Sequence, residues 1–194
     1  MNDDLIYYSL WLTPNRQSTI SKKIQSIASK LCTNAHNPTF PTHITLNTFH
    51  CTTTQLQQYQ LQLNELFNNQ LNYIIDVKCK SLASTPDKMF MTVFVLVEHN
   101  PQLLNVKYQI ESIINQSGNI EQSVQQYIPH ISLLYDTDNV INPAQREQYI
   151  NDTGSDILSG SILSCDTIEL MQCNGTDYTK WDKICDYKLS TPQQ

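Results

Sequence analysis

The spacing of hydrophobic residues changes several times along the chain, and each spacing predicts a type of element. Apolar residues that recur every three or four positions predict helices, and short alternating or continuous apolar runs predict strands. The run "MFMTVFVLV" (89–97) has the strongest strand pattern, whereas apolar residues at helical spacing mark a helix within "PNRQSTISKKIQSIASKLC" (14–32). Proline at the first position and glycine near the end favour a helix from Pro101 to about Gly118.

Strands and helices are therefore predicted to alternate, with no linker that would separate independent domains. Each half of the chain contains a helix-flanked strand with a His-Ile-hydroxyl triplet, which indicates a weak internal duplication. We predict the α+β fold class, with two pseudo-symmetric lobes of mainly antiparallel sheet and outer helices, facing a central cleft. Residues 1–194 are expected to form this single bilobal domain. The expected strands are 5–13, the segment around His43, 73–83, 89–97, the segment around His130, 162–173 and 181–189, and the expected helices are 14–32, 54–68, 101–118 and 143–151.

Composition and charge exclude several classes of function. The four glycines form no GxGxxG or GxxxxGK[ST] motif, which argues against a Rossmann or P-loop nucleotide site. The net charge is −6 and the only arginines are Arg16 and Arg146, so the chain lacks the basic stripe with which proteins hold long nucleic acids. A phosphate-bearing substrate is therefore expected to be a small molecule.

The cysteines and the N-terminal segment indicate neither a metal site nor a membrane span. The six cysteines form no CxxC pair and no zinc spacing, so we expect no metal and no other cofactor. The N-terminus is acidic where a signal peptide is basic, and no apolar stretch reaches the roughly 18 residues of a transmembrane helix. A cytoplasmic monomer is the default expectation.

Two segments of the chain, "FPTHITLNTF" and "YIPHISLLYD", repeat one pattern. Side chains at positions i and i+2 of a strand share a face. His43 therefore shares a face with Thr45, and His130 shares one with Ser132, while the intervening isoleucines point to the core. One imidazole and one hydroxyl group from each strand are predicted to project into the cleft together.

A single H-x-[ST] triplet is a weak signal, because short motifs match by chance. The triplet "HCT" at His50 also fits, but it lacks alternating apolar flanks and leads into a predicted helix. His50 is therefore interpreted as structural, as are His36 and His99. The doubled context distinguishes the two strand histidines from these three.

"THITL" and "PHISL" resemble the paired H-x-[ST]-x signatures of the two-histidine (2H) phosphoesterase superfamily. Within it, "YYSLWLTP", "HISLLY" and the closing "KWDKICDYKL" are most similar to the plant and fungal cyclic phosphodiesterases, and the resemblance covers the whole chain in order. The resemblance implies metal-independent hydrolysis of nucleoside 2′,3′-cyclic phosphates to 2′-phosphates. It also implies hydrolysis of ADP-ribose 1″,2″-cyclic phosphate, a by-product of tRNA splicing, to ADP-ribose 1″-phosphate. It leaves a location at internal membranes such as the Golgi open.

The chemistry of a cyclic phosphodiester agrees with this pattern. Its hydrolysis needs a base that activates water on one side of the phosphorus and an acid that protonates the leaving oxygen on the other. His43 and His130 can supply both, since histidine titrates near neutral pH, and each contribution is worth roughly 10²–10⁴-fold in rate. Thr45 and Ser132 are expected to donate hydrogen bonds to the remaining phosphate oxygens. Which histidine acts as the base stays open.

Two aromatic residues are further candidates for substrate binding. Trp11 shares a strand face with Ser9, where its indole could stack on a base or ribose, although a place in the core fits equally well. The family resemblance puts Tyr135 near the phosphate, but strict alternation turns this side chain away from His130. Tyr135 can contribute only if a bulge or the end of the strand turns it back. Trp181 is assigned to the core.

Two other functions stay open at this point. One is an RNA end-processing 2H enzyme, either a 2′,5′ RNA ligase/phosphodiesterase or a 3′-end nuclease, which the acidic net charge disfavours. The other is a nucleotide-binding module without catalysis, which the two intact triplets disfavour.

Overall fold

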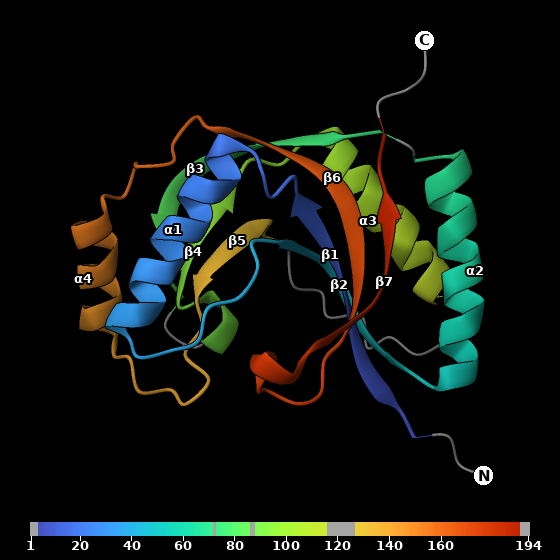
Figure 1. Ribbon diagram of the computed structural model, residues 1–194, viewed down its shortest axis with the longest axis horizontal. Coiled ribbons are helices and arrows are strands. Elements are labelled where there is room, and N and C mark those ends of the chain that lie inside the picture. Colours follow the sequence, from blue (N-terminus) through green and yellow to red (C-terminus); the bar gives the residue numbers. More distant parts are fainter. Residues whose placement is uncertain (1–3, 72, 86–87, 116–126, 191–194) are drawn as a thin grey trace.

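The strands and helices follow the predicted order (Figure 1). The structure is a computed structural model that describes residues 4–71, 73–85, 88–115 and 127–190. The strands are β1 (Ile6–Pro14), β2 (Ile44–Cys51), β3 (Ile75–Ala83), β4 (Val93–Val97), β5 (His130–Leu134), β6 (Ile162–Gln172) and β7 (Asp182–Lys188). The helices are α1 (Thr19–Asn34), α2 (Thr53–Asn69), α3 (Pro101–Asn115) and α4 (Pro143–Thr153), with short 3-10 helices η1 (Met89–Met91) and η2 (Tyr178–Lys180).

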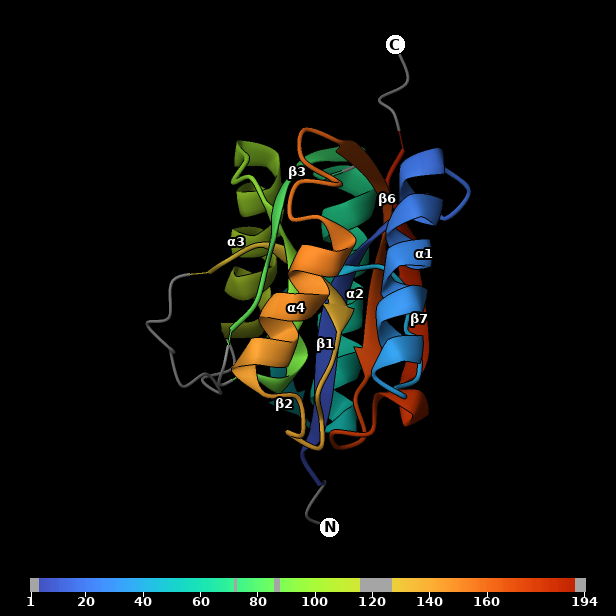
Figure 2. The same cartoon turned by 90° about the vertical axis from the view of Figure 1, so that its left-hand side faces the viewer.

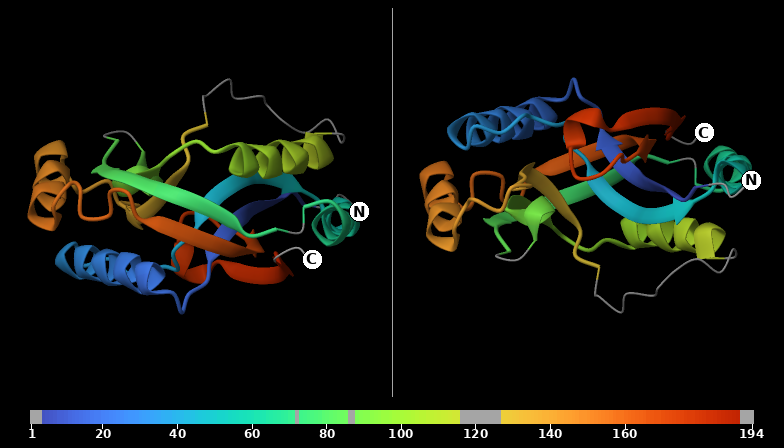
Figure 3. Two further views of the ribbon diagram at one scale, coloured as in Figure 1. Left: turned by 90° about the horizontal axis from the view of Figure 1, so that it is seen from above. Right: turned by 90° about the horizontal axis from the view of Figure 1, so that it is seen from below.

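The strands form one antiparallel sheet in the order β1-β2-β5-β4-β3-β6-β7. β1 also pairs with β6, so six strands close into a ring, and β7 extends the sheet from β6. The helices lie outside this ring (Figure 3). The architecture confirms the predicted α+β class with an antiparallel sheet and outer helices.

The ring contains two similar pairs of strands, and each pair carries one of the repeated histidine segments. β1 pairs with β2 in the first half of the chain, and β4 pairs with β5 in the second half. Among the described residues, β2 and β5 meet through a single register pair, Ile44–Ile131. We call this junction the β2–β5 seam. On the other side of the ring, β3 joins β6 through four successive pairs.

The helices α1 to α4 cover the outer face of the sheet. Figure 2 shows α1, α3 and α4 around the strands, where α1 packs against β5 and α3 against β2. Both α2 and α4 begin with a capping box, formed by Thr52 with Gln55 and by Asn142 with Gln145. None of the helices in the described part of the chain is both long and apolar enough to span a bilayer.

The predicted helix at 14–32 begins later than expected. β1 extends to Pro14, and α1 starts at Thr19. Ser18 provides the start signal, because its hydroxyl accepts a hydrogen bond from the backbone N–H of Ser21. The apolar spacing alone did not reveal this cap.

The strand predicted at 89–97 is wrong in its first part, because Met89–Met91 forms η1 and β4 starts only at Val93. The Thr92 hydroxyl donates to the Met89 carbonyl at 2.9 Å, and such a local bond favours a turn over an extended chain. The end of the third helix, predicted near Gly118, lies outside the described residues.

Candidate active site

The β2–β5 seam brings the two repeated segments together. Ile44 pairs with Ile131 in antiparallel register. Continuing this register by one residue in each direction places His43 opposite Ser132 and Thr45 opposite His130. The two histidines are then diagonal neighbours, and such positions are about 7–8 Å apart. Both imidazole rings line one cleft.

Both histidine rings are held in the same way by the backbone. The Nδ1 atom of His43 lies 2.7 Å from the carbonyl oxygen of Pro41, and that of His130 lies 2.8 Å from the carbonyl oxygen of Ile128. A carbonyl oxygen only accepts hydrogen bonds, so Nδ1 carries the proton in each ring. Nε2 is then the unprotonated nitrogen of each neutral imidazole and is able to accept a proton.

One cleft of about 570 Å³ contains all six side chains predicted for the site. This volume lies in the range of roughly 300–1,000 Å³ that is typical of small-molecule sites. The predicted residues in its wall are Trp11, His43, Thr45, His130, Ser132 and Tyr135. The wall also includes Tyr7, Ser9, Thr48, Lys88, Phe90, Cys173 and Trp181, with Met89 and Met91 of η1.

A bulge in β5 explains how Tyr135 reaches this cleft. Consecutive residues of β4 pair with Ser132 and Leu134, so Leu133 is an extra residue in β5. An extra residue shifts the alternation of side chains by one. Leu133 and Leu134 are both buried, and Tyr135 returns to the cleft face instead of following Ile131. Strict alternation would turn Tyr135 away from His130, and this bulge reverses that orientation.

A bulge at the equivalent position in β2 repeats this arrangement. Consecutive residues of β1 pair with Thr45 and Asn47, which leaves Leu46 as the extra residue. After this shift Thr48 lines the cleft. Thr48 in β2 is therefore equivalent to Tyr135, which directly follows β5, and sequence alternation did not identify it.

His43 is enclosed on several sides. Its ring stacks on the indole of Trp11 with centroids 3.7 Å apart and planes 10° from parallel. The hydroxyl oxygen of Tyr135 lies 3.3 Å from His43 Nε2, so the phenol can donate to it. Burial lowers the pKa of His43 to about 4, although the hydrogen bond to the backbone carbonyl acts in the opposite direction. His43 is therefore a neutral imidazole near pH 7.

His130 has a more open setting. Its side chain is half-buried and meets the ring of Phe94 edge-on, with centroids 5.3 Å apart and an angle of 69°. Burial is the main cause that lowers the pKa of His130, and the nearby charge of Lys88 lowers it further. The hydrogen bond to Ile128 partly opposes both effects.

Ser132 and Thr45, the two hydroxyl residues of the site, differ in burial and in their hydrogen bonds. Ser132 is buried, and its Oγ donates to the carbonyl oxygen of Phe90 at 2.7 Å. The hydroxyl must rotate away from Phe90 before it donates to a bound phosphate. Thr45 is half-buried, and its carbonyl oxygen accepts a hydrogen bond from the Tyr127 hydroxyl at 3.1 Å.

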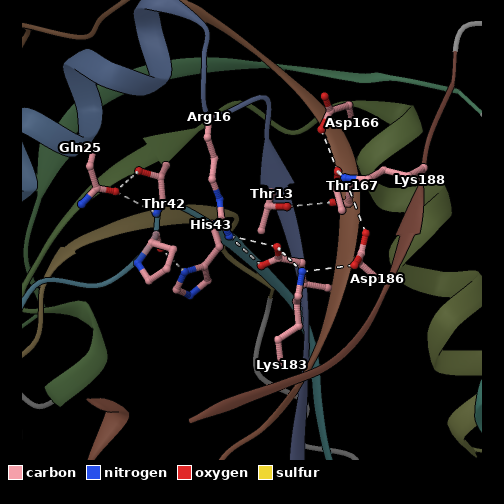
Figure 4. Close-up of polar contacts among 12 residues, drawn as sticks. Thr13, Arg16, Gln25, Thr42, His43, Asp166, Thr167, Lys183, Asp186 and Lys188 are labelled. Atoms are coloured by element: carbon pink, nitrogen blue, oxygen red, sulfur yellow. Dashed lines mark hydrogen bonds and ion pairs between the residues drawn. The ribbon is translucent and has the colours of Figure 1, made fainter. Parts of the chain in front are cut away.

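The loop before His43 is fixed by a glutamine from α1 (Figure 4). The side-chain amide of Gln25 donates to the Phe40 carbonyl at 3.1 Å and accepts from the backbone and hydroxyl of Thr42 at 3.2 and 3.1 Å. These bonds bracket Pro41, whose carbonyl orients the His43 ring. Gln25 is a positioning residue that no sequence motif indicated.

The chain just after Tyr135 is anchored by a buried ion pair. Arg146 Nη2 lies 3.1 Å from Asp136 Oδ2, and both side chains are almost fully buried. Asp136 also accepts hydrogen bonds from the backbone of Val140 and Ile141. The pair holds the end of β5, and with it the turn that leads away from Tyr135.

The structure places two further aromatic residues of the sequence analysis, Trp181 and His50. Trp181 was assigned to the core, but its half-buried ring lines the cleft and its Nε1 donates to the carbonyl of Gly175 at 3.0 Å. His50 is exposed and packs on Tyr7, with ring centroids 4.8 Å apart, which agrees with a structural role.

Among the described residues, no group of three or more His, Cys, Asp or Glu side chains is placed to hold a metal ion.

A family model described as cyclic phosphodiesterase-like protein matches residues 6–188. No curated protein sequence is significantly similar to this chain.

Solved structures of low sequence identity share the fold. The crystal structure of E. coli LigT complexed with 3′-AMP superposes with a TM-score of 0.62 at 11% identity, covering 97% of this chain and 100% of LigT. TT0787 of Thermus thermophilus gives a TM-score of 0.66 at 12% identity over 98% of this chain and 100% of its own. Kluyveromyces marxianus Usb1 gives 0.51 at 12% identity, covering 94% of this chain and 98% of Usb1.

Proposed function

The chain belongs to the cyclic phosphodiesterase-like family of 2H phosphoesterases and is thus a phosphodiesterase; on that premise we propose that it hydrolyses nucleoside 2′,3′-cyclic phosphates to nucleoside 2′-phosphates. The second proposed substrate is ADP-ribose 1″,2″-cyclic phosphate, which would give ADP-ribose 1″-phosphate. This activity would serve the metabolism of tRNA-splicing by-products. We further propose that the chain belongs to the plant and fungal branch of the family and acts as a cytoplasmic monomer.

The single observation that carries this proposal is the pair of histidines across the β2–β5 seam. Each ring carries its proton on Nδ1 and lines the same cleft as the other, diagonally across one register pair. A noncatalytic module has no need for two unprotonated Nε2 atoms in one cleft. An acid-base pair needs both.

The proposed reaction uses both rings, and the choice of the bond that breaks follows the family resemblance. One Nε2 removes a proton from water, and the oxygen of that water forms a bond to phosphorus. The bond from phosphorus to the ribose O3′ breaks, and O3′ takes a proton from the other, protonated Nε2. The orientation of the cyclic phosphate between His43 and His130 determines which ring has which role.

The proposed catalytic roles belong to His43 and His130, and the hydroxyl groups of Thr45 and Ser132 would hold the phosphate oxygens. Hydrogen bonds to charged groups are worth about 1.5–3 kcal/mol each. Trp11 would stack on the base or the ribose, and Tyr135 would lie near the phosphate. We propose that the reaction proceeds without a metal ion.

Ligands seen in a protein of the same fold support a nucleotide as the substrate. E. coli LigT has been crystallised with 3′-AMP, with NADP+ and with phosphate. That protein therefore binds a mononucleotide and a dinucleotide. By analogy, the cleft of this chain is proposed to accept a nucleotide-sized substrate.

The test is to incubate the purified protein with adenosine 2′,3′-cyclic phosphate and with ADP-ribose 1″,2″-cyclic phosphate in excess EDTA. Phosphorus NMR follows the loss of the cyclic signal and identifies the monoester. We expect clean opening to one monoester in EDTA. No consumption of either substrate would overturn the proposal, and a cyclic-phosphate-ended oligoribonucleotide would then be tested as the substrate of an RNA end-processing enzyme. Loss of activity that Mg²⁺ or Zn²⁺ restores would overturn its metal independence.

A further inference from the structure

A second cavity of about 250 Å³ adjoins the catalytic cleft. The two cavities share Trp11, Tyr135 and Trp181 in their walls, so these three aromatic rings form the boundary between them. The second cavity continues beyond the boundary to Arg16 and Lys183. We call it the outer compartment. None of the functions assigned above uses it.

The outer compartment is locally cationic in an acidic protein. Its wall carries the side chains of Arg16 and Lys183 and one carboxylate, Glu169, whereas the whole chain has a net charge of −6. Figure 4 shows Arg16 and Lys183 reaching the same carboxylate from opposite sides. Asp186 and Lys188 of β7 lie next to this group and form an ion pair with each other at 3.6 Å.

Glu169 holds Arg16 in place and does not exhaust its hydrogen-bonding capacity. Nη2 of Arg16 lies 3.0 and 3.2 Å from the two carboxylate oxygens of Glu169. The Glu169 side chain is 7% exposed and that of Arg16 is 57% exposed, so a buried anchor fixes a solvent-facing guanidinium. Within the described part of the chain, Nε and Nη1 of Arg16 make no hydrogen bond, and a fixed guanidinium is well suited to bind phosphate.

Lys183 adds a second cation to the same wall. Its Nζ lies 3.8 Å from Glu169 and 3.2 Å from Asp186, and its side chain is about half exposed. To reach an anion in the compartment, the ammonium group must share or give up these two carboxylate contacts. The wall of the outer compartment thus carries two cationic groups beside one carboxylate, and a bound diphosphate would add to this network of charges.

Aromatic rings complete the compartment. Phe40 and Tyr178 meet edge-on with centroids 5.5 Å apart, and Tyr178 lies 6.3 Å from Trp181. The Tyr178 hydroxyl donates to the Pro38 carbonyl at 2.9 Å, which ties η2 to the loop before β2. Aromatic faces stack on nucleobases with little dependence on sequence, at about 1–3 kcal/mol per base. Rings beside two cations are a combination that suits a nucleotide.

We propose that the outer compartment binds a second nucleotide unit, joined through a diphosphate to the ribose that carries the cyclic phosphate, and that Arg16 and Lys183 select such substrates over mononucleoside cyclic phosphates. The inference rests on the proposed function, since it deepens the substrate preference of the same site. Of the two candidate substrates, ADP-ribose 1″,2″-cyclic phosphate fills both cavities, whereas adenosine 2′,3′-cyclic phosphate lacks the diphosphate.

The test compares kcat/KM for these two substrates in the wild type and in Arg16→Ala, Lys183→Ala and Lys30→Ala. The measured quantity is kcat/KM for ADP-ribose 1″,2″-cyclic phosphate divided by kcat/KM for adenosine 2′,3′-cyclic phosphate. This ratio is expected to fall about 10–100-fold in Arg16→Ala, because a hydrogen bond to a charged group is lost, and by less in Lys183→Ala. Lys30 is exposed on α1 outside both cavities, so its variant controls for the change in net charge and should leave the ratio unchanged.

Equal losses on both substrates in Arg16→Ala would overturn the proposal, because Arg16 would then act on the catalytic site or on folding. Lys183→Ala keeps the Arg16–Glu169 pair, and an unchanged ratio in both variants would also overturn it. If Arg16→Ala lowers kcat/KM for an oligoribonucleotide ending in a cyclic phosphate, but not for ADP-ribose 1″,2″-cyclic phosphate, the proposal is wrong and the compartment binds RNA instead.

Binding of ADP-ribose, measured by calorimetry, separates this inference from the proposed function. If the wild type turns over neither cyclic phosphate but binds ADP-ribose, and Arg16→Ala weakens that binding at least tenfold, the proposed role of the outer compartment is supported and the proposed hydrolysis is wrong. If turnover occurs and ADP-ribose binds equally to the wild type and the variant, only the proposed role of the outer compartment is wrong.

Discussion

The two histidine strands of the site have the same backbone plan and different surroundings. A histidine just before β2 and another at the start of β5 are each held through Nδ1 by the carbonyl two residues earlier, and each is followed by a hydroxyl residue and then a bulge. The neighbouring strand contributes an aromatic residue opposite the hydroxyl residue in both cases: Trp11 pairs with Thr45, and Phe94 pairs with Ser132. The likeness therefore extends beyond the two short motifs.

The difference lies in how closely each ring is covered. Trp11 stacks flat on His43, and Tyr135 from the other strand reaches its Nε2, whereas Phe94 touches His130 only edge-on. His43 is 4% exposed and His130 is half-buried. A symmetric backbone thus presents two chemically unequal imidazoles, and this inequality is what an acid-base pair needs.

The largest expected effect comes from removing either imidazole. His43→Ala and His130→Ala should each lower kcat for a 2′,3′-cyclic nucleotide by roughly 10²–10⁴-fold, because each ring transfers one proton. Steady-state kinetics on variants with native circular dichroism would measure this. His99→Ala, a change at an exposed histidine outside the cleft, is the control. Retention of more than about a tenth of kcat by either catalytic variant would contradict the paired roles.

The two strands also differ in the ion pair that follows β5, since we describe no such pair after β2. Removing this ion pair tests how much it contributes. Asp136→Ala leaves the buried guanidinium of Arg146 without its carboxylate and should destabilise the protein by about 3–5 kcal/mol. Urea unfolding would measure the loss. Asp138→Ala removes an exposed carboxylate two residues away and should change stability by less than about 0.5 kcal/mol. Similar values for both variants would show that the anchor contributes little.

The burial of His43 predicts a pH dependence of folding. Folding lowers its pKa from 6.5 to about 4, so the unfolded chain binds the proton more readily. The free energy of unfolding should be highest above pH 6.5 and should fall by about 3 kcal/mol as the pH drops to 4. Urea unfolding of the wild type and His43→Gln across this range would test it. The variant should lose less stability than the wild type, and parallel curves would rule out the buried neutral ring.

The smallest expected effect concerns the contact that crosses between the two halves. Tyr135→Phe removes the hydroxyl 3.3 Å from His43 Nε2 and keeps the ring in its stack on Phe40. The loss of one neutral hydrogen bond is worth about 0.5–1.5 kcal/mol, so kcat/KM should fall roughly 2–10-fold. Tyr178→Phe, at a tyrosine that contacts Pro38 instead of a histidine, is the matched control on the mononucleoside substrate. Equal effects would argue against a specific role for the Tyr135 hydroxyl.

The order of strands and helices could be predicted from the sequence because periodic burial leaves a local trace in it. The convergence of the two histidine segments on one cleft was also accessible, since both copies of the pattern keep the same alternation. The positions of the bulges were not, because an extra leucine beside another leucine, as at Leu133 and Leu134 in β5, reads like an ordinary apolar run. η1 was missed for a similar reason, since a methionine-rich segment suits a buried strand or a turn equally well.

Residues that act through distant contacts left no trace that a single sequence can show. Gln25 fixes the loop before His43 from α1, and nothing in a helical glutamine marks that contact. Trp181 looked like a core residue because tryptophan is usually well buried, yet it forms part of the boundary between the two cavities. Such assignments depend on which elements meet in space.

The closed ring of six strands has a consequence for how the two imidazoles are kept together. A single residue pair joins β2 to β5 in the described part of the chain, so no long ladder holds this junction by itself. The ring also closes on the far side, where β3 joins β6 through four successive pairs. The two halves of the site are therefore linked by backbone pairing in both directions around the ring. Substitutions at the β3–β6 junction are expected to affect catalysis without changing any residue of the cleft wall.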